Sequence, residues 1–476
     1  MNWIDLIISV FSTFLLTFTV FLISGYIFIG LYSIGELKKY LNKNSFTNYR
    51  LLANSADAPH ISILAPAFNE GANIIENVRS LLSIYYSNLE VIIINDGSKD
   101  DTLQKLISAY ELYQSAHFVD ERLSTKPIRG VYKSWNPIYS KLIVVDKENG
   151  GKADAMNVGI NVSKNDYIVC IDVDCILEQD AILKLVKPFL ESSSKRVIAT
   201  GGVVRIANGC EIADGRLLKV HLPHQLLPRM QTLEYIRAFL LGRMAWSRLG
   251  GLMLISGAFG AFDKEIAIKC GGYNHKTVGE DMELVVRMRR YMEEMKLPYR
   301  VSFIPDPLCW TEAPSDFKIL GRQRNRWTRG TIETLKIHKV MFFNPKYSLM
   351  GILSYPYWFI FEFMAPIIEF TGMIYFILSI ILGLVNFVNF FSLLFMIYSF
   401  GVLYSTFAIL MEVRTYNQYK ERGDMIRLLL TAILEPIILH PFGVWSAIMG
   451  NIDLLKNKSS WGEMTRAGLS GTKNNS

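Results

Sequence analysis

Two aspartates, Asp172 and Asp174, stand at the end of a short apolar run at residues 167–171. Paired carboxylates at the end of a buried strand suit Mg²⁺ or Mn²⁺, since these ions take oxygen ligands and bridge to substrate phosphates. Burying two like charges without a cation would be costly. The pair therefore predicts a divalent metal site in which Asp172 and Asp174 are ligands.

A second group of residues that could bind a ligand precedes a long hydrophobic block. It consists of Gln323, Arg324, Arg326 and Trp327. Two fixed cations can neutralise a diphosphate leaving group where charge develops, and the indole can stack on a sugar ring. A solvated helix face with one buried tryptophan explains the same string. The motif gains weight only from the acidic residues that stand before it.

Glu280 and Asp281 open a strongly helical run at residues 282–295. Carboxylates at a helix N-terminus are favoured by the helix dipole, so capping is one interpretation. The other makes Asp281 a general base that takes the proton from an attacking hydroxyl. Capping and catalysis are compatible.

Two further elements could contact a ligand, one through a carboxylate and the other through backbone amides and a lysine. Asp96 ends an apolar run, where it can accept hydrogen bonds from a nucleobase or ribose, or cap the next helix. Gly150 and Gly151 lead through Lys152 into a helix, which lets backbone amides and one lysine approach an anion. The bland alternative for this element is an ordinary junction between a loop and a helix.

These residues need elements to position them, and the middle of the chain alternates between strand and helix patterns. Helical patterns at residues 72–83 and 181–190 separate the apolar runs, which argues for a mostly parallel α/β sheet covered by helices. Ligands bind at the carboxyl ends of strands in such sheets. We expect strands at residues 61–68, 89–95, 141–145, 167–171 and 197–200, and a surface insertion at 115–139.

The hydrophobic content, 50% overall, is concentrated at the two ends of the chain. Residues 6–31 carry no charge and exceed the roughly 20 residues that a spanning helix needs. Basic residues follow this segment at Lys38, Lys39, Lys43 and Arg50, so the positive-inside rule places the next domain in the cytoplasm. We expect four parts: a transmembrane helix with linker at 1–50, an α/β domain at 51–345, an interface helix with transmembrane helices at 346–455, and a basic polar tail at 456–476.

The C-terminal membrane region is harder to divide. We expect an interface helix at residues 355–366, a span that continues to about residue 384, a second span at 390–411 and a third candidate at 428–450. The last candidate is interrupted by Glu435, Pro436, His440 and Pro441. Three spans would put the basic tail outside, against the charge rule, so the last segment is re-entrant or the count differs by one.

Composition excludes several classes of protein. The five cysteines are scattered without a CxxC pair, which favours a reducing compartment and argues against a zinc site or disulfide framework. The net charge of +7 is modest for 476 residues, and part of it is expected beside an anionic leaflet of membrane lipids. No basic tail or nucleic-acid motif occurs, so we expect no nucleic-acid partner.

In this order, the motifs around Asp96, Lys152, Asp172–Asp174, Asp281 and Gln323–Trp327 resemble the family 2 glycosyltransferases. The similarity is to their membrane-embedded, often processive branch, which includes cellulose, hyaluronan and poly-N-acetylglucosamine synthases. It extends over nearly the whole chain. It implies a GT-A (Rossmann-like) cytosolic domain flanked by transmembrane helices, and an inverting displacement on a UDP-sugar with Mg²⁺ or Mn²⁺.

The resemblance also implies roles for individual residues. Catalysis is assigned to Asp281 with Glu280, and metal binding to Asp174 with Asp172, of which Asp174 is the principal ligand. The nucleotide site is assigned to Asp96, Glu70, Lys152 and Asp172. The diphosphate and acceptor site is assigned to Gln323, Arg324, Arg326, Trp327, Ser256 and Gly257.

The resemblance leaves alternatives open. The loop at residues 256–260 lacks the cysteine of cellulose synthases, and we favour UDP-N-acetylglucosamine or UDP-glucose as donor. One hypothesis is a plasma-membrane polymerase that extrudes its polysaccharide through its own helices; the other is a lipid glycosyltransferase that adds one sugar to a membrane acceptor. A non-catalytic scaffold would lack the carboxylates. The sequence leaves accessory subunits open.

Overall fold

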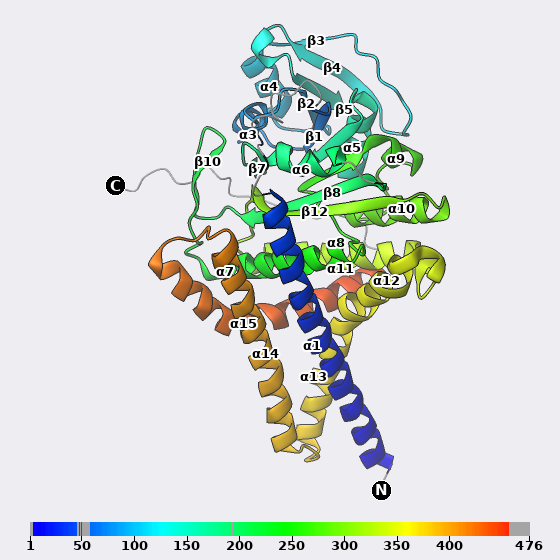
Figure 1. Ribbon diagram of the computed structural model, residues 1–476, viewed down its shortest axis with the longest axis vertical. Coiled ribbons are helices and arrows are strands. Elements are labelled where there is room, and N and C mark those ends of the chain that lie inside the picture. Colours follow the sequence, from blue (N-terminus) through cyan, green and yellow to red (C-terminus); the bar gives the residue numbers. More distant parts are fainter. Residues whose placement is uncertain (1–2, 45–46, 48, 50–57, 192–193, 457–476) are drawn as a thin grey trace.

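The computed structural model describes residues 3–44, 47, 49, 58–191 and 194–456. An α/β domain forms one end of the molecule, and long helices extend from its base (Figure 1). One mixed sheet of ten strands organises the domain. Its spatial order is β3 (Leu112–Gln114), β4 (Ile128–Ser134), β5 (Leu142–Lys147), β2 (Leu89–Asn95), β1 (Ile61–Ala67), β6 (Tyr167–Ile171), β11 (Phe259–Asp263), β8 (Arg196–Ile206), β12 (Tyr299–Thr311) and β7 (Ile176–Leu177).

The centre of the sheet is parallel. Strands β5, β2, β1 and β6 run in the same direction, with Ile63 paired to Val91 on one side and to Val169 on the other. These strands are almost continuous apolar runs because helices cover both faces of a parallel sheet. The five strands expected from the sequence are all present, so the predicted α/β fold is confirmed.

The predicted surface insertion at residues 115–139 is wrong in part. It contains β4, which pairs antiparallel with β5 and β3 and closes this edge of the sheet. The pattern of β4 is half-polar, as expected for a strand near an edge with one exposed face. Antiparallel pairing also occurs inside the sheet, where β11 lies between β6 and β8.

Helices connect the strands and cover the sheet. They are α3 (Ile74–Leu82), α4 (Thr102–Tyr110), α5 (Lys152–Val162), α6 (Ala181–Leu190), α9 (Lys264–Lys269) and α10 (Glu280–Glu294). Helix α5 packs against β1 and β2, and its residues are buried from Ala153 to Val162. A two-stranded ribbon of β9 (Glu211–Ala213) and β10 (Arg216–Lys219) lies outside the main sheet.

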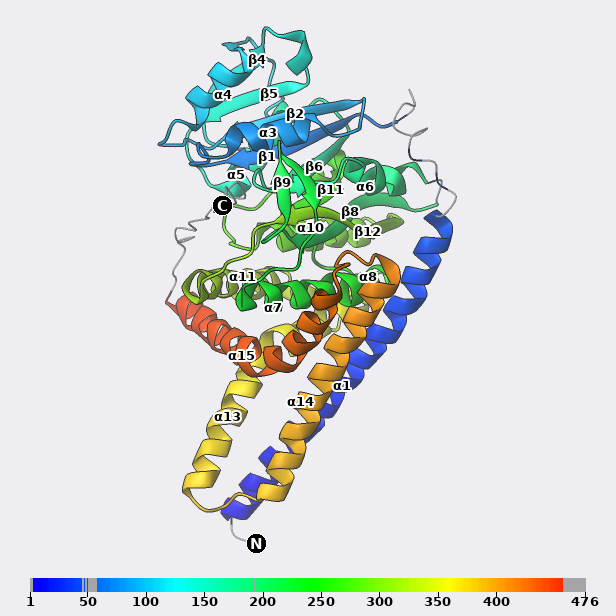
Figure 2. The ribbon, with the colours of Figure 1, turned by 90° about the vertical axis from the view of Figure 1, so that its left-hand side faces the viewer.

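A layer of helices separates the sheet from the apolar helices. It consists of α11 (Phe317–Ile337) and a continuous helical stretch formed by α7 (Leu226–Tyr235), the π-helical segment η2 (Ile236–Arg243) and α8 (Met244–Arg248). Figure 2 shows α7 and α11 under the sheet, above α15 (Arg422–Leu455). This layer is where the α/β domain meets the apolar helices.

In the described part of the chain, four helices are long and apolar enough to cross a membrane: residues 8–44 within α1 (Trp3–Asn44), residues 350–381, α14 (Phe387–Thr415) and residues 423–455 within α15. Residues 350–381 contain η5 (Met350–Ser354), α12 (Tyr355–Tyr357), η6 (Trp358–Met364) and α13 (Ala365–Ile381).

Their directions differ. Helices α1, α13 and α14 extend away from the sheet, with the described N-terminal end of α1 far from the domain (Figures 1 and 2). Helix α15 contains Pro436 and Pro441, which remove backbone donors and bend a helix. It stays beside the domain and packs on α7 and α11. With three helices directed away, the described end of α15 remains on the domain side; the tail at 456–476 lies outside the described residues.

One buried ion pair joins the sheet to α14. Arg205 of β8 donates to Glu412, and both side chains are almost fully buried. We expect Glu412→Gln to lower the free energy of unfolding by roughly 3–5 kcal/mol, because it leaves the Arg205 charge buried without its partner. Thermal unfolding of the full chain in lipid nanodiscs measures this. The control is Glu421→Gln, an exposed carboxylate near the same helix end. Equal melting temperatures for the two variants would contradict this view of the ion pair.

Candidate active site

The candidate site lies where the parallel strands end. Asp96 follows β2, the loop at residues 148–151 follows β5, and Asp172 follows β6. Because these strands are parallel neighbours around β1, their carboxyl ends meet at one edge of the sheet. Motifs that are far apart in the sequence therefore lie close together in the structure.

Asp96 holds the glycine loop in place. Its carboxylate accepts hydrogen bonds from the backbone N–H groups of Gly150, at 2.9 Å, and Gly151, at 2.8 Å. It also pairs with the fully buried Lys147 ammonium at 2.6 Å. Gly151 has a φ of 84°, a left-handed value that glycine adopts without strain. Both Asp96 oxygens therefore have partners inside the protein, and they fix the loop that leads into α5.

The capping interpretation of Asp96 is not what the structure shows. The N-cap of α4 is Asp101, five residues further along the chain. Glu70, the other residue assigned to the nucleotide site, lies after β1, where its backbone N–H donates to Thr102 Oγ1 at 3.0 Å. Asp96 and Glu70 thus belong to the loops behind the cavity described below, and neither lines it.

Lys152, the first residue of α5, lies among carboxylates. Its ammonium group contacts Asp172 and lies 4.0 Å from Glu280 Oε1. Burial acts to lower the pKa of Lys152, but Asp172 and Glu280 outweigh that effect and raise it, so the side chain stays charged. Burial raises the pKa of Glu280 to about 7, with a further contribution from Asp281 and an opposing one from Lys152.

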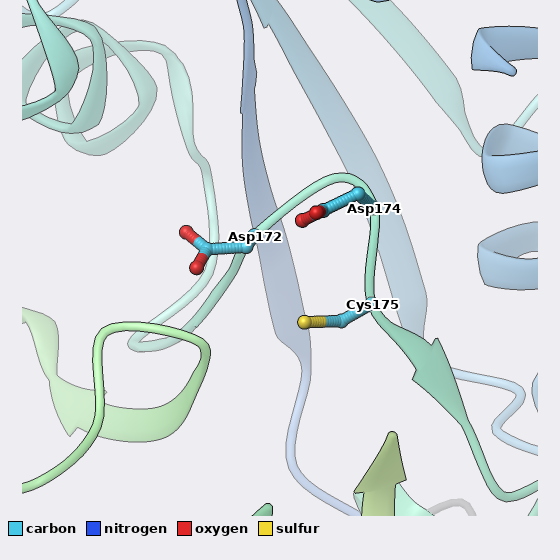
Figure 3. Close-up of side chains that lie close together, drawn as sticks. All are labelled: Asp172, Asp174 and Cys175. Atoms are coloured by element: carbon cyan, nitrogen blue, oxygen red, sulfur yellow. The ribbon is translucent and has the colours of Figure 1, made fainter. Parts of the chain in front are cut away.

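The predicted metal ligands lie close together. One ligand atom each from Asp172, Asp174 and Cys175 can be chosen so that all lie within 4.8 Å of one another. Figure 3 shows the three side chains extending from the turn after β6 in the same direction. Carboxylate oxygens are the ligands that Mg²⁺ and Mn²⁺ prefer, whereas a thiol suits softer metals. The donor set at this turn therefore fits a hard divalent cation held by Asp172 and Asp174.

Asp281 is oriented by two backbone groups. Its carboxylate accepts hydrogen bonds from Gly257 N–H, at 2.9 Å, and from Met282 N–H, at 2.8 Å. A Cβ atom at position 257 would lie 3.1 Å from Lys152 Nζ and 3.2 Å from an Asp281 oxygen. Gly257 thus permits these two side chains to approach each other, and its neighbour Ser256 lines the same cavity.

The two arginines of the motif on α11 have different surroundings. The Arg324 guanidinium makes two hydrogen bonds to the carboxylate of Glu234, which lies on α7. It also lies 4.6 Å from the centre of the Trp327 ring, in a cation–π arrangement. Arg324 therefore ties α11 to α7, and its charge is balanced by Glu234, a partner the sequence analysis did not anticipate.

Arg326 and Gln323 line the same cavity as Glu280 and Asp281. Arg326 acts electrostatically on Glu280 and lowers its pKa, against the larger effect of burial. Gln323 Oε1 is buried, and it has no hydrogen-bond partner in the described part of the chain. Both side chains line the cavity, as does Arg324, whose charge is balanced by Glu234.

A single cavity of about 1680 Å³ joins this site to the apolar helices. It continues from the loop carboxylates past α11 and between α1, α13 and α14. The predicted site residues that line it are Lys152, Asp172, Ser256, Gly257, Glu280, Asp281, Gln323, Arg324, Arg326 and Trp327. Asp174, like Asp96 and Glu70, does not line it.

Sequence analysis did not place in a cavity a series of ionisable residues, although it named Glu435 and His440 as interruptions of an apolar segment. Arg237 of η2 donates to Glu435 of α15 at 2.7 and 2.9 Å. His440 Nε2 lies 2.8 Å from Glu369 Oε2, which joins α15 to α13. The signal was present, because charged residues inside apolar segments face a protein interior or a water-filled cavity far more often than lipid.

Comparison with known families agrees with this architecture. Residues 62–209 match the family described as glycosyl transferase family 2. Residues 167–409, slightly more than half of the chain, match glycosyl transferase family group 2.

Curated relatives include poly-beta-1,6-N-acetyl-D-glucosamine synthases. The enzyme of Staphylococcus aureus (strain COL) is 29% identical over 330 residues, which cover 68% of this chain and 66% of that protein. The enzyme of Staphylococcus epidermidis is 27% identical over 318 residues, 66% of each chain. The chain thus matches slightly less than two thirds of these relatives' own length.

Two solved structures are more distant. A mannosyltransferase from Pyrobaculum calidifontis, in complex with GDP-mannose and Mn²⁺, is 15% identical with a TM-score of 0.49, covering 92% of this chain and all of that one. Glucosyl-3-phosphoglycerate synthase from Mycobacterium tuberculosis is 17% identical with a TM-score of 0.35, covering 61% and 84%.

The family match extends across the α/β domain and into the apolar helices, as the order of the sequence motifs predicted. The GT-A-like α/β fold flanked by candidate membrane helices is confirmed together with it. The chain belongs to glycosyltransferase family 2.

Proposed function

We propose that this protein moves a sugar from a UDP-sugar to a growing polysaccharide and passes the product through its own membrane helices. The observation that carries the proposal is the single cavity, because it joins the reactive carboxylates to the interior of the apolar helices. UDP-N-acetylglucosamine and UDP-glucose are the favoured donors. The similarity to poly-beta-1,6-N-acetyl-D-glucosamine synthases supports the first of these.

In this proposal the donor nucleotide binds over the carboxyl ends of β2, β5 and β6. Lys152 and Asp172 contact it directly, while Asp96 acts through the glycine loop that it fastens. Glu70 supports the same loops from the end of β1. Asp174 and Asp172 hold Mg²⁺ or Mn²⁺, which when bound neutralises charge on the diphosphate.

Transfer follows from the positions of four side chains. The acceptor hydroxyl lies against Asp281, whose carboxylate takes its proton as the oxygen attacks the anomeric carbon. The new bond forms opposite the bond that breaks, so the configuration inverts and UDP leaves with the bonding electrons. Arg326 and Gln323 stabilise the departing diphosphate. Trp327, partly exposed to the cavity, covers one face of the acceptor sugar.

The proposed location is the plasma membrane, with the α/β domain in the cytoplasm. Lys38, Lys39 and Lys43 lie at the end of α1 nearest the domain, as the positive-inside rule requires of a cytoplasmic side. Helix α15 ends on this same side.

One observation favours a second candidate, a lipid glycosyltransferase. The part of the cavity farthest from Asp281 is walled by apolar side chains of α13 and α14, which suit an acyl chain better than a sugar polymer. These residues include Phe376, Ile377, Ile380, Leu393 and Leu394. A lipid-linked acceptor would place its tail there and its sugar at Trp327.

Product size separates the two candidates. Full-length protein in nanodiscs is supplied with labelled UDP-N-acetylglucosamine, UDP-glucose or GDP-mannose, with and without added membrane lipid extract. We expect release of UDP and a product of high molecular mass that stays in the aqueous phase. A product extracted wholly into chloroform would contradict the polymerase and support the lipid glycosyltransferase. Absence of nucleotide release from every donor would contradict both.

The role of Asp281 is tested by Asp281→Asn, which keeps the hydrogen-bond geometry at one oxygen but cannot take a proton. General-base catalysis is worth about 10²–10⁴-fold, so we expect at least a 100-fold loss of transfer with UDP affinity unchanged. Asp120→Asn, at an exposed carboxylate on the domain surface, is the matched control. Turnover within a few-fold of the unmodified protein in Asp281→Asn would remove this residue from its proposed role.

Metal binding has a readout that does not depend on turnover. We expect Mn²⁺ to bind the UDP complex and Asp174→Asn to weaken that binding at least about tenfold, because even groups that only support metal ligands are worth about 10–100-fold. Electron paramagnetic resonance of free Mn²⁺ measures it. Asp166→Asn, at the other end of β6, is the control. Equal Mn²⁺ affinity in the two variants would show that Asp174 is not a ligand.

A further inference from the structure

Four oxygen-bearing side chains line the cavity where the α/β domain meets the apolar helices. They are Tyr26 of α1, Tyr357 of α12, Glu362 of η6 and Tyr404 of α14. Among the described residues, none of these four side chains makes a hydrogen bond or an ion pair through its hydroxyl or carboxylate group. The cavity leaves these groups accessible, Glu362 as an exposed side chain and the three tyrosines as half-buried ones, so a ligand in the cavity can form hydrogen bonds with all four.

The four side chains form one group, called here the tyrosine–glutamate cluster. The rings of Tyr26 and Tyr404 lie 5.3 Å apart, tilted by 56°. Tyr357 lies close enough to Tyr26, Glu362 and Tyr404 for each to act on it electrostatically. On its other side Tyr357 packs edge-on against Trp246, at 4.9 Å. Three separate parts of the chain thus direct phenol rings and one carboxylate at the same section of the cavity.

The charges beside the cluster are already paired. Arg237 is held by Glu435 and by the hydroxyl of Ser405, so it is not available as a counter-ion for Glu362. On the other side, His440 and Glu369 pair with each other. Glu362 is therefore the carboxylate of this section that no cation of the described chain neutralises.

We propose that the tyrosine–glutamate cluster is a subsite for one hexose unit of the acceptor, lying deeper in the cavity than Trp327. The phenol hydroxyls of Tyr26, Tyr357 and Tyr404 donate to and accept from sugar hydroxyls, and Glu362 accepts from two adjacent ones. Phenol rings cover the apolar face of a sugar ring. This inference rests on the proposed function, and gives it a second point at which the acceptor is held.

Other occupants fit the cluster less well. A divalent cation takes about six or more oxygen ligands, usually with more than one carboxylate, and the cluster offers one. An acyl chain would leave the hydroxyls and the Glu362 carboxylate desolvated without hydrogen bonds, which is unfavourable. A neutral polyhydroxyl ligand satisfies all four groups without adding charge.

Binding of oligosaccharide tests the proposal without requiring turnover. Full-length protein in nanodiscs, with UDP and Mn²⁺ present, is titrated with fluorescent chitotetraose and with fluorescent cellotetraose. A hydrogen bond to a charged group contributes strongly, so we expect Glu362→Gln to weaken binding about tenfold or more. The triple Tyr→Phe variant at positions 26, 357 and 404 removes only the hydroxyls and is expected to weaken binding at least as much.

Matched controls come from α13 and α1. Tyr375→Phe alters a phenol of α13 whose hydroxyl lies 2.8 Å from Ser12, outside the cavity lining. Glu36→Gln alters a carboxylate of α1 beside Arg248, at 3.8 Å. Both controls are expected to bind the tetrasaccharides as the unmodified protein does, and all variants are expected to bind UDP with equal affinity.

The outcomes separate this inference from the proposed function. Unchanged tetrasaccharide binding in both cluster variants, or no binding by the unmodified protein, overturns the subsite. Competition by octyl phosphate but not by free tetrasaccharide also overturns it, since the cluster would then face a lipid. Failure of the proposed function shows instead as absence of UDP release from every UDP-sugar, whatever the binding results.

Discussion

Four carboxylates gather at one end of the sheet, and their mutual repulsion is the constraint on which the rest of the site depends. Lys152 is the cation that permits the arrangement, since it contacts Asp172 and lies 4.0 Å from Glu280. Three elements must meet for this to happen: α5 supplies the lysine, the turn after β6 supplies Asp172 and Asp174, and α10 supplies Glu280 with Asp281. Arg326 also acts on Glu280, and a divalent cation at Asp172 and Asp174 would reduce the remaining repulsion.

The same residues are tied to the membrane helices through α11. Its Arg324 is paired with Glu234 of α7, and both helices pack on α15. Helix α15 is in turn joined to η2 by the ion pair between Glu435 and Arg237. The helix that carries Trp327 is therefore held between the sheet and the apolar helices, which would fix the proposed acceptor and donor positions relative to each other.

Much of the fold could be predicted because buried parallel strands are continuous apolar runs. The strand expected at residues 89–95 coincides with β2, and that at 167–171 with β6. Strand β4 was not predicted, because its half-polar sequence resembles that of a loop and the strand is stabilised by its pairing with β5. The path of α15 could not be predicted either. Hydropathy alone does not distinguish a helix that crosses the membrane from one that bends beside the domain.

The sequence singled out many residues that the structure places around one cavity, but it revealed few of their contacts. Spacing along the chain brought together Lys152, Asp172 and Asp281, because each follows or begins an element at the same edge of the sheet. It did not reveal that Arg324 pairs with the carboxylate of Glu234, a residue 90 positions earlier in the chain. Nor did it show that Asp96 is engaged by the glycine loop. Pairing between distant elements leaves no local pattern in a sequence.

The central claim is that one cavity carries the acceptor from the donor site into the membrane helices. The most direct test is an experimental structure of the full-length Asp281→Asn variant with UDP, Mn²⁺ and chitotetraose or cellotetraose. The account predicts Mn²⁺ on Asp174 with the diphosphate beside Arg326, and the oligosaccharide running from Trp327 toward Tyr26 and Tyr404. Nucleotide bound away from Lys152 and Asp174, or an oligosaccharide lying outside the cavity, would contradict it.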